Sequence, residues 1–238
     1  PTVDEDLILN HKPTAHAAVK AAMAVGLGPV VTEAVQQNYL NFYGNLMKEV
    51  DRQIGELLDV FDQTGAAGED ALNNTLIIRT SDHGENGLCH GGLRQKNFNA
   101  YEETLRVPLV YSNPKLFPTP KRSDALVSHV DFLPTIASLL GAPPEARADW
   151  QGVDYSHLIL GQSTAPVQDS IVFTYDDFQA GQARGPYVRQ PNHIISLREK
   201  RYKIARYYDP SGKEKPQWEM YDLRRDPLER TNIAAPGY

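Results

Sequence analysis

Two adjacent side chains, Asp82 and His83, follow a short apolar run and could ligate a metal ion. Aspartate offers a hard anionic oxygen and histidine a neutral imidazole nitrogen. The apolar residues 76–78 predict a buried strand, and ligands of open α/β sheets bind beyond the carboxyl ends of the strands. Turn residues are also common at strand ends, so a plain turn is the alternative interpretation. Two adjacent ligands cannot enclose an ion, and further ligands would have to come from elsewhere.

A loop with several glycines and two basic side chains follows this pair. Glycines between residues 84 and 97 allow the backbone to approach a ligand closely. Lys96 carries a point charge suited to a tetrahedral anion, Arg94 is an alternative for that role, and a solvated surface lysine is the other interpretation. An unperturbed histidine titrates near neutral pH, so His90 could protonate a leaving group, or it could be a loop histidine bonded to backbone or water.

These motifs and their order resemble the sulfatases and their relatives the phosphonate monoester hydrolases, within the alkaline phosphatase superfamily. The resemblance covers roughly residues 38 to 235. The matching elements are Asn-Thr-Leu-Ile-Ile (74–78), Ser-Asp-His-Gly-Glu (81–85), the glycine-rich loop that ends in Lys96, Tyr-Glu-Glu-x-x-Arg-Val-Pro-Leu (101–109), Val-Ser-His-Val-Asp-Phe-Leu-Pro-Thr (127–135) and a C-terminal signature from Trp218 to Asn232.

The resemblance implies roles for particular side chains. Asp82 and His83 would ligate a divalent metal ion, most often Ca²⁺ and sometimes Mn²⁺, which acts as Lewis acid and template. Lys96 would contact the sulfate and the leaving oxygen of a small sulfate or phosphonate ester. His90 is the candidate proton donor, and Asn99 a candidate substrate contact.

The nucleophile that the resemblance implies has no counterpart in the sequence. It would be a formylglycine made from a Cys or Ser in a Cys/Ser-x-Pro-x-Arg motif, and the chain contains no such motif. Its single cysteine, Cys89, is followed by His-Gly-Gly-Leu and is interpreted as a packed thiol. We therefore expect a fragment whose N-terminal half, with the formylglycine and two acidic metal ligands, would precede residue 1. Such a chain should not hydrolyse sulfate esters by itself.

The element pattern predicts an α/β fold. We expect residues 1–165 to form part of a mixed, mostly parallel sheet flanked by helices, and residues 166–238 to form a small C-terminal antiparallel α+β subdomain. The resemblance implies that the larger sheet is like that of alkaline phosphatase. Helices are predicted at 15–25, at 33–62 after a Thr32 cap, and at 132–140, with Asp131 or Ser128 capping the last. The long helix has an apolar stripe that should pack on the sheet. Strands are predicted at 75–78, 107–111, 127–130, 170–175, 192–197, 202–207 and 217–223.

Charge and composition limit the kinds of partner and the location that we expect for the chain. The net charge of −6 gives no electrostatic support for nucleic-acid binding, and no apolar run of 18 residues predicts a membrane span. We expect a soluble protein of bacterial type, cytoplasmic or periplasmic. A core without its early strands would expose an edge and an apolar face, which a homo-oligomer or the missing N-terminal half would cover.

Three functions remain open from the sequence. The first is a hydrolase of sulfate esters, or a fragment of one. The second is a phosphonate or phosphodiester hydrolase on the same scaffold, because both esters are tetrahedral anions. The third is a non-catalytic binding module that keeps the fold without turnover.

Overall fold

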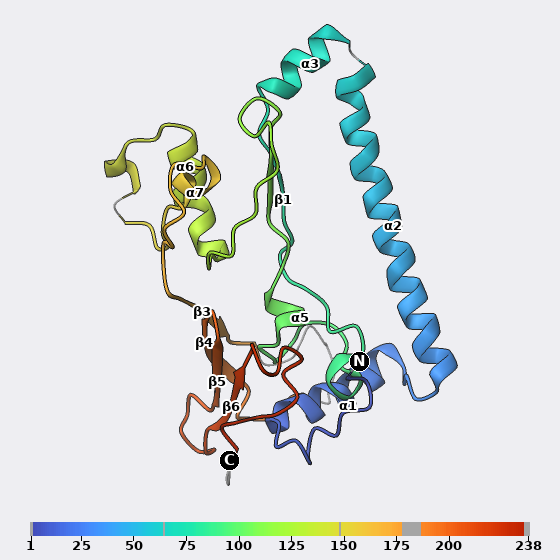
Figure 1. Cartoon of the computed structure of the whole chain (residues 1–238). Helices are drawn as coiled ribbons and strands as arrows, with labels where there is room; N and C mark the ends of the chain where they lie inside the picture. Colours follow the sequence, from blue (N-terminus) through green and yellow to red (C-terminus); the bar gives the residue numbers. More distant parts are fainter. Residues whose placement is uncertain (1, 64, 148, 178–186, 236–238) are drawn as a thin grey trace.

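The computed structural model describes residues 2–63, 65–147, 149–177 and 187–235. Figure 1 shows a long helix on one side, a small sheet at the base and a helical layer beyond two central strands. The helical elements are α1 (Thr14–Leu27), α2 (Glu33–Gln63), α3 (Ala66–Asn73), α4 (Cys89–Gly92), α5 (Glu102–Leu105), η1 (His129–Asp131), α6 (Phe132–Leu139), η2 (Pro144–Arg147) and α7 (Ser156–Ile159).

Both predicted N-terminal helices form. Helix α1 is rich in alanine, the strongest helix former, and ends before Gly28, whose positive φ of 82° suits glycine. At the start of α2 the hydroxyl of Thr32 accepts a hydrogen bond from the backbone N–H of Val35 at 3.4 Å, which confirms the predicted cap. No helix among the described residues is both long enough and apolar enough to cross a membrane.

Two short strands cross the centre of the molecule. Strand β1 (Ile77–Arg79) pairs antiparallel with β2 (Val110–Ser112), in the register Ile77 to Ser112 and Arg79 to Val110. The predicted strand at 107–111 is shortened because Pro108 has no N–H to donate to a ladder. The predicted strand at 127–130 does not form; residues 129–131 are instead a turn of 3₁₀ helix.

The mostly parallel sheet that the sequence predicted is not found in the described parts of the chain, where both sheets are antiparallel. Parallel pairing needs a crossover, usually through a helix, that returns the chain to the starting end of the first strand. Here the segment after β1 runs down to the base of the molecule, forms α4 and α5 there, and climbs back as β2 in the opposite direction (Figure 1).

The predicted C-terminal antiparallel sheet is confirmed. Its strand order is β3-β4-β5-β6, a simple meander. Alternation along β4 and β5 buries Ile194, Ala205 and Tyr207 on one face and leaves the other face more exposed. The strands are β3 (Ser170–Tyr175), β4 (His193–Glu199), β5 (Tyr202–Tyr208) and β6 (Gln217–Asp222).

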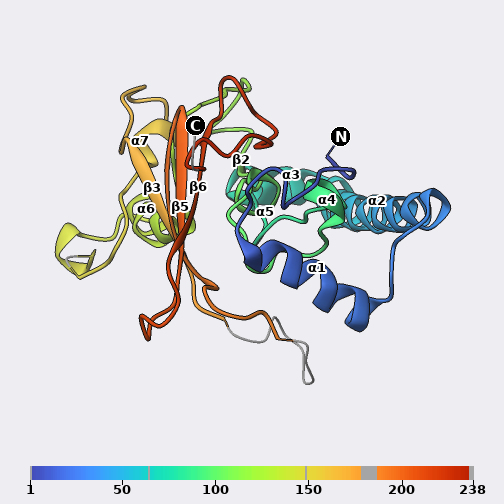
Figure 2. The same ribbon diagram turned by 90° about the horizontal axis from the view of Figure 1, so that it is seen from below.

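One core cluster joins α1 to this sheet. Ala15, Val19 and Met23 of α1 pack with Phe98 and Tyr101 of the central loop and with inner residues of the sheet. Seen from below, α1 and the loop that carries α4 and α5 lie together at the base (Figure 2). The cluster therefore draws residues from both sides of the predicted boundary at 165/166. The division of the chain there stays a prediction.

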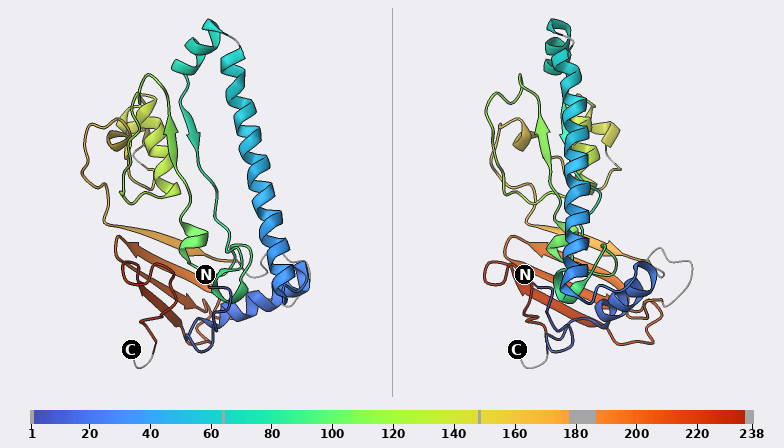
Figure 3. Two further views of the ribbon diagram at one scale, coloured as in Figure 1. Left: turned by 45° about the vertical axis from the view of Figure 1, so that its right-hand side comes forward. Right: turned by 90° about the vertical axis from the view of Figure 1, so that its right-hand side faces the viewer.

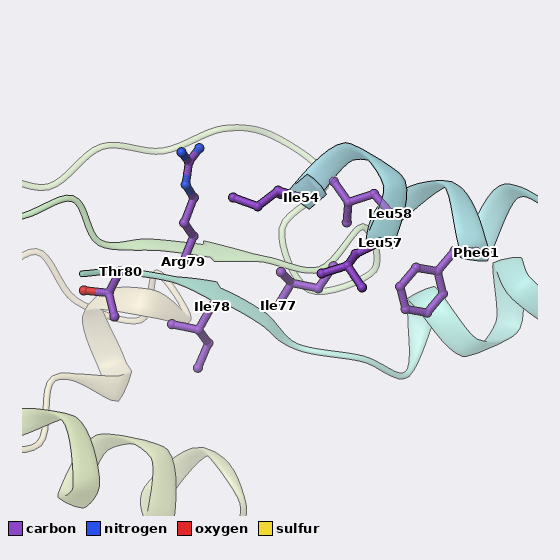
Figure 4. A pocket seen from close by; sticks show the side chains of 8 residues that line it. All are labelled: Ile54, Leu57, Leu58, Phe61, Ile77, Ile78, Arg79 and Thr80. Atoms are coloured by element: carbon purple, nitrogen blue, oxygen red, sulfur yellow. The ribbon is translucent and has the colours of Figure 1, made fainter. Parts of the chain in front are cut away.

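Helix α2 stands largely uncovered along its length (Figure 3). Only its C-terminal part approaches the strands, where Ile54, Leu57 and Phe61 line a groove of about 410 Å³ against Ile77 and Ile78 of β1 (Figure 4). The predicted packing of the whole stripe on a sheet is therefore wrong for this chain. The exposed apolar residues of α2 are Val35, Leu40, Phe42, Tyr43, Leu46, Met47, Val50, Leu57, Leu58 and Val60.

Candidate metal and anion site

Asp82 and His83 lie just beyond β1 with their side chains toward one another. Nε2 of His83 is 3.3 Å from Oδ2 of Asp82. Nδ1 of the same ring is 2.9 Å from the carbonyl oxygen of Gly84, which can only accept, so Nδ1 carries a proton. The carboxylate of Asp82 is 82% exposed, and the backbone N–H of His83 helps to hold its pKa below the usual range.

This donor pair fits a divalent metal ion. Metal-ligating histidines commonly donate their second ring N–H to a carbonyl or carboxylate, which fixes the tautomer and the ring orientation. The Gly84 carbonyl does this for His83. Nε2 of His83 and the carboxylate oxygen of Asp82 lie as close as two ligands on one ion do, and both side chains remain accessible.

Sequence reasoning did not place His129 near this pair. Its Nε2 donates to the carbonyl oxygen of Ser81 at 2.8 Å, and the hydroxyl of Ser81 donates to the carbonyl oxygen of His83 at 2.7 Å. His129 therefore holds the backbone that carries the two candidate ligands. The position of His129 in the motif at residues 127–135 was a signal for a functional role, but the sequence favoured helix capping as the role of that motif. Ser128 and Asp131 form a reciprocal capping box, but it caps the 3₁₀ turn η1, and Asp131 makes no side-chain capping bond to α6.

Lys96 and Arg94 differ sharply in their surroundings. Lys96 is half-buried, and its amine has no hydrogen bond or ion pair within the part of the chain that the structure describes. Arg94 is buried, donates from Nη2 to the carbonyl of Gly28 at 2.8 Å and lies over the ring of Tyr39. Arg94 is thus already engaged, which leaves Lys96 as the stronger candidate for an anion.

His90 is buried away from solvent. Its Nδ1 is 3.0 Å from Glu5 and its Nε2 is 3.2 Å from Glu103, while its ring stacks on Tyr101 at 3.5 Å between centroids. Burial alone would lower the pKa of His90, but the bonds to Glu103 and Glu5 outweigh it and raise the pKa. Both ring nitrogens donate to carboxylates, so the geometry makes His90 a structural cation and offers no proton to a leaving group.

The comparisons with known proteins address the fold and the motifs together. A family model described as Sulfatase matches residues 7–142, more than half of the chain. The chain belongs to the sulfatase family. A second model, described as N-sulphoglucosamine sulphohydrolase, C-terminal, matches residues 90–237.

Two curated members of the sulfatase family illustrate the relationship. The chain is 31% identical over 201 residues to an N-acetylglucosamine-6-O-sulfatase of Bacteroides thetaiotaomicron, covering 83% of this chain and 32% of that protein. It is 30% identical over 217 residues to arylsulfatase A of Homo sapiens, covering 80% of this chain and 38% of that protein. The chain thus spans about a third of the length of such relatives.

Solved structures of other proteins have a similar fold. A protein in complex with its substrate D-glucosamine-2-N,6-O-disulfate has a TM-score of 0.70 and 26% identity, covering 89% of this chain and 40% of that one. The phosphonate monoester hydrolase of Agrobacterium radiobacter has a TM-score of 0.59 and 24% identity, covering 80% and 36%. The second likeness shows a shared fold.

A second group of possible ligands in this sulfatase-family chain is better explained as a buried ion network. Atoms of His90, Glu103 and Glu229 lie within 4.8 Å of one another. Lys203 already forms an ion pair with Glu229, and both nitrogens of His90 face carboxylates, Glu103 and Glu5. The positive charges are supplied by side chains, so a cation here would add charge where it is already balanced.

Asn99 and Cys89, which the sequence also singled out, have structural roles. Asn99 is buried, and its Oδ1 accepts from the N–H of Tyr101 at 3.2 Å and the hydroxyl of Thr104 at 2.7 Å. These bonds fix the start of α5 and leave no free carbonyl for substrate. Burial raises the pKa of the Cys89 thiol, which agrees with an inert packed cysteine.

Proposed function

We propose that this chain supplies one part of a site that hydrolyses sulfate esters with a divalent cation. The observation that carries the proposal is the convergence of Nε2 of His83 and Oδ2 of Asp82, at 3.3 Å, within a chain of the sulfatase family. Asp82 and His83 would hold the ion, with Ca²⁺ proposed first and Mn²⁺ second. The ion would supply Lewis-acid stabilisation of the charge on the sulfate oxygens.

The other residues have distinct tasks in this proposal. The amine of Lys96, which has no partner among the described residues, would bind the sulfate oxygens and the leaving oxygen. His129 and Ser81 would keep the backbone of the metal ligands in place. The sequence lacks the Cys/Ser-x-Pro-x-Arg motif, so the nucleophile would come from another polypeptide segment. By itself the chain should bind ions and anions without turnover.

A small sulfated sugar is the substrate class we favour. An N-acetylglucosamine-6-O-sulfatase and a protein complexed with D-glucosamine-2-N,6-O-disulfate are both similar to most of this chain. The fold shared with a phosphonate monoester hydrolase supports a second candidate, a phosphonate monoester. Both substrates present tetrahedral anions, which suit the same cation and the same lysine.

A chimeric protein tests the proposal. This chain would replace the aligned part of the Bacteroides thetaiotaomicron N-acetylglucosamine-6-O-sulfatase, and hydrolysis of 4-nitrophenyl sulfate and of a phosphonate monoester would be measured with Ca²⁺ and with Mn²⁺. We expect metal-dependent sulfate ester hydrolysis that Asp82→Ala and Lys96→Ala each reduce by at least about a hundredfold. The exposed Lys115→Ala is the control. A folded chimera with unchanged activity in both site variants would refute the proposed roles.

A further inference from the structure

One carboxylate closes the loop that leads to Lys96. The Oε1 atom of Glu85 accepts hydrogen bonds from the N–H of Gln95 at 2.8 Å, from the N–H of Gly87 at 3.2 Å and from the hydroxyl of Tyr39 at 2.9 Å. The three donors come from the end of the loop, its beginning and helix α2. A half-buried acceptor shared by three segments fixes their relative positions.

The residue before Lys96 is held on both sides of its backbone. Gln95 donates its N–H to Glu85, and its carbonyl accepts from the N–H of Asn86 at 3.1 Å and from the side-chain amide of Asn86 at 2.6 Å. Gln95 has a positive φ of 63°, a region that residues other than glycine seldom adopt. Such a conformation persists only where the surroundings enforce it, and it sets the direction in which the chain continues to Lys96.

Tyr39 extends this control to α2. Burial, followed by the hydrogen bond to Glu85, raises the pKa of Tyr39, so its hydroxyl stays protonated and donates. The guanidinium of Arg94 also lies over the Tyr39 ring, at 6.0 Å from its centroid. Tyr39 of α2 therefore contacts the loop at two places, at Glu85 near its beginning and at Arg94 near its end.

The geometry points to Glu85 as the positioning residue for Lys96, with Tyr39 as its support. Glu85 does not touch the anion in this proposal; it orients the backbone from which the amine of Lys96 reaches the anion. The inference rests on the proposed function, because only that function assigns an anion to Lys96. It adds a residue two positions after His83 that links the metal-ligand segment to the lysine.

The experiment compares Glu85→Ala and Glu85→Gln with the wild-type chain. Glutamine keeps an oxygen at the acceptor position, so it should restore what alanine loses. The exposed Glu199→Ala, at the end of β4, is the matched control. Exchange of the Gln95 amide proton is followed by NMR. The rate of Lys96 acetylation is followed by mass spectrometry, with and without inorganic sulfate and Ca²⁺, and melting temperatures monitor folding.

We expect the Gln95 amide of Glu85→Ala to exchange at least about tenfold faster, because its acceptor is gone. Sulfate should protect Lys96 from acetylation in the wild-type, Glu85→Gln and Glu199→Ala chains, and at least about fivefold less in Glu85→Ala. If Glu85→Ala does not fold, Tyr39→Phe, which removes one hydroxyl, should show a smaller change of the same kind.

The outcomes separate the two proposals. Unchanged Gln95 exchange and unchanged sulfate protection in a folded Glu85→Ala chain would overturn the role of Glu85. Lack of sulfate protection in the wild-type chain would instead count against the anion-binding role of Lys96. In that case, faster Gln95 exchange in Glu85→Ala would still support closure of the loop by Glu85.

Discussion

The imidazole of His83 lies between two acceptors, with Nε2 at 3.3 Å from Oδ2 of Asp82 and Nδ1 at 2.9 Å from the carbonyl of Gly84. The carbonyl holds a proton on Nδ1, so Nε2 is the ring nitrogen that can bind a metal ion once it carries no proton. A metal ion placed by both donors would depend on each of them and on the backbone that His129 holds through Ser81.

Removal of these groups should weaken metal binding in a graded way. Asp82→Ala removes a ligand and should abolish most of the affinity for Ca²⁺ and Mn²⁺, whereas His129→Ala removes a supporting bond and should cost about tenfold. Isothermal titration of the chain with each ion gives both values. The exposed Asp59→Ala on α2 should bind as the wild type does. Equal affinity of the Asp82→Ala and wild-type chains would refute the site.

Gly84 should tolerate no side chain. A Cβ atom there would lie 2.0 Å from the carbonyl oxygen of Glu103, and the Gly84 N–H donates to the carbonyl of Thr104. We expect Gly84→Ala to lower the free energy of unfolding by roughly 2–3 kcal/mol, as overpacking does. Gly44→Ala, in α2 with open space around it, should raise that free energy slightly. Urea denaturation measures both; similar effects of the two variants would contradict the prediction.

His90 should make the fold less stable at alkaline pH. The pKa of His90 is raised because the bonds to Glu103 and Glu5 outweigh burial, with Lys12 opposing them. Its stabilisation is therefore complete below the ordinary histidine pKa and is lost as pH rises through the raised value. Urea midpoints at pH 6 and pH 9 should differ more for the wild type than for His90→Gln. Glu229, whose pKa burial raises to about 7, acts in the same direction and is present in both chains. His157→Gln, which replaces a different histidine, is the control and should keep the wild-type difference.

His16 should make the fold less stable at acidic pH. It is fully buried between the hydroxyls of Tyr207 at 2.9 Å and Tyr101 at 3.0 Å, and burial lowers its pKa to about 4. The folded chain binds this proton less well than the unfolded chain, so stability falls as pH drops from 6.5 toward 4, by up to about 3 kcal/mol. His16→Gln should be less stable at pH 7 but lose less between pH 7 and pH 4.5. An equal loss in both chains would refute the assignment.

Local patterns predicted the elements well and the long-range contacts poorly. Spacing in α2 and the Thr32 cap are properties of neighbouring residues, and the structure contains both. The partners of His90 are Glu5 and Glu103, and the first of them is 85 residues away in the sequence. Nothing local to His90 could distinguish a buried cation from a proton donor. His129 is similar, since its bond to Ser81 spans 48 residues.

The uncovered face of α2 should cause self-association. Leu57 is 70% exposed and Phe42 is 64% exposed. The apolar residues of α2 recur at intervals of three and four residues, so they form a stripe along one face of the helix. Contiguous apolar surface of this kind usually marks an interface. We expect concentration-dependent association of the wild-type chain in light scattering, with bound 1-anilinonaphthalene-8-sulfonate as a second signal. Association would bury the stripe against a second copy of the chain.

Positive charge on the apolar stripe of α2 should weaken this self-association. The double variant Leu46→Lys and Leu57→Lys places two ammonium groups on the stripe and should reduce the apparent association constant by at least about tenfold. Leu140→Lys alters a leucine that is 80% exposed but lies beyond the end of α6, so it should have no effect. A wild-type chain that remains monomeric at high concentration would contradict the prediction. Equal loss of association in Leu140→Lys would show that a different surface is responsible.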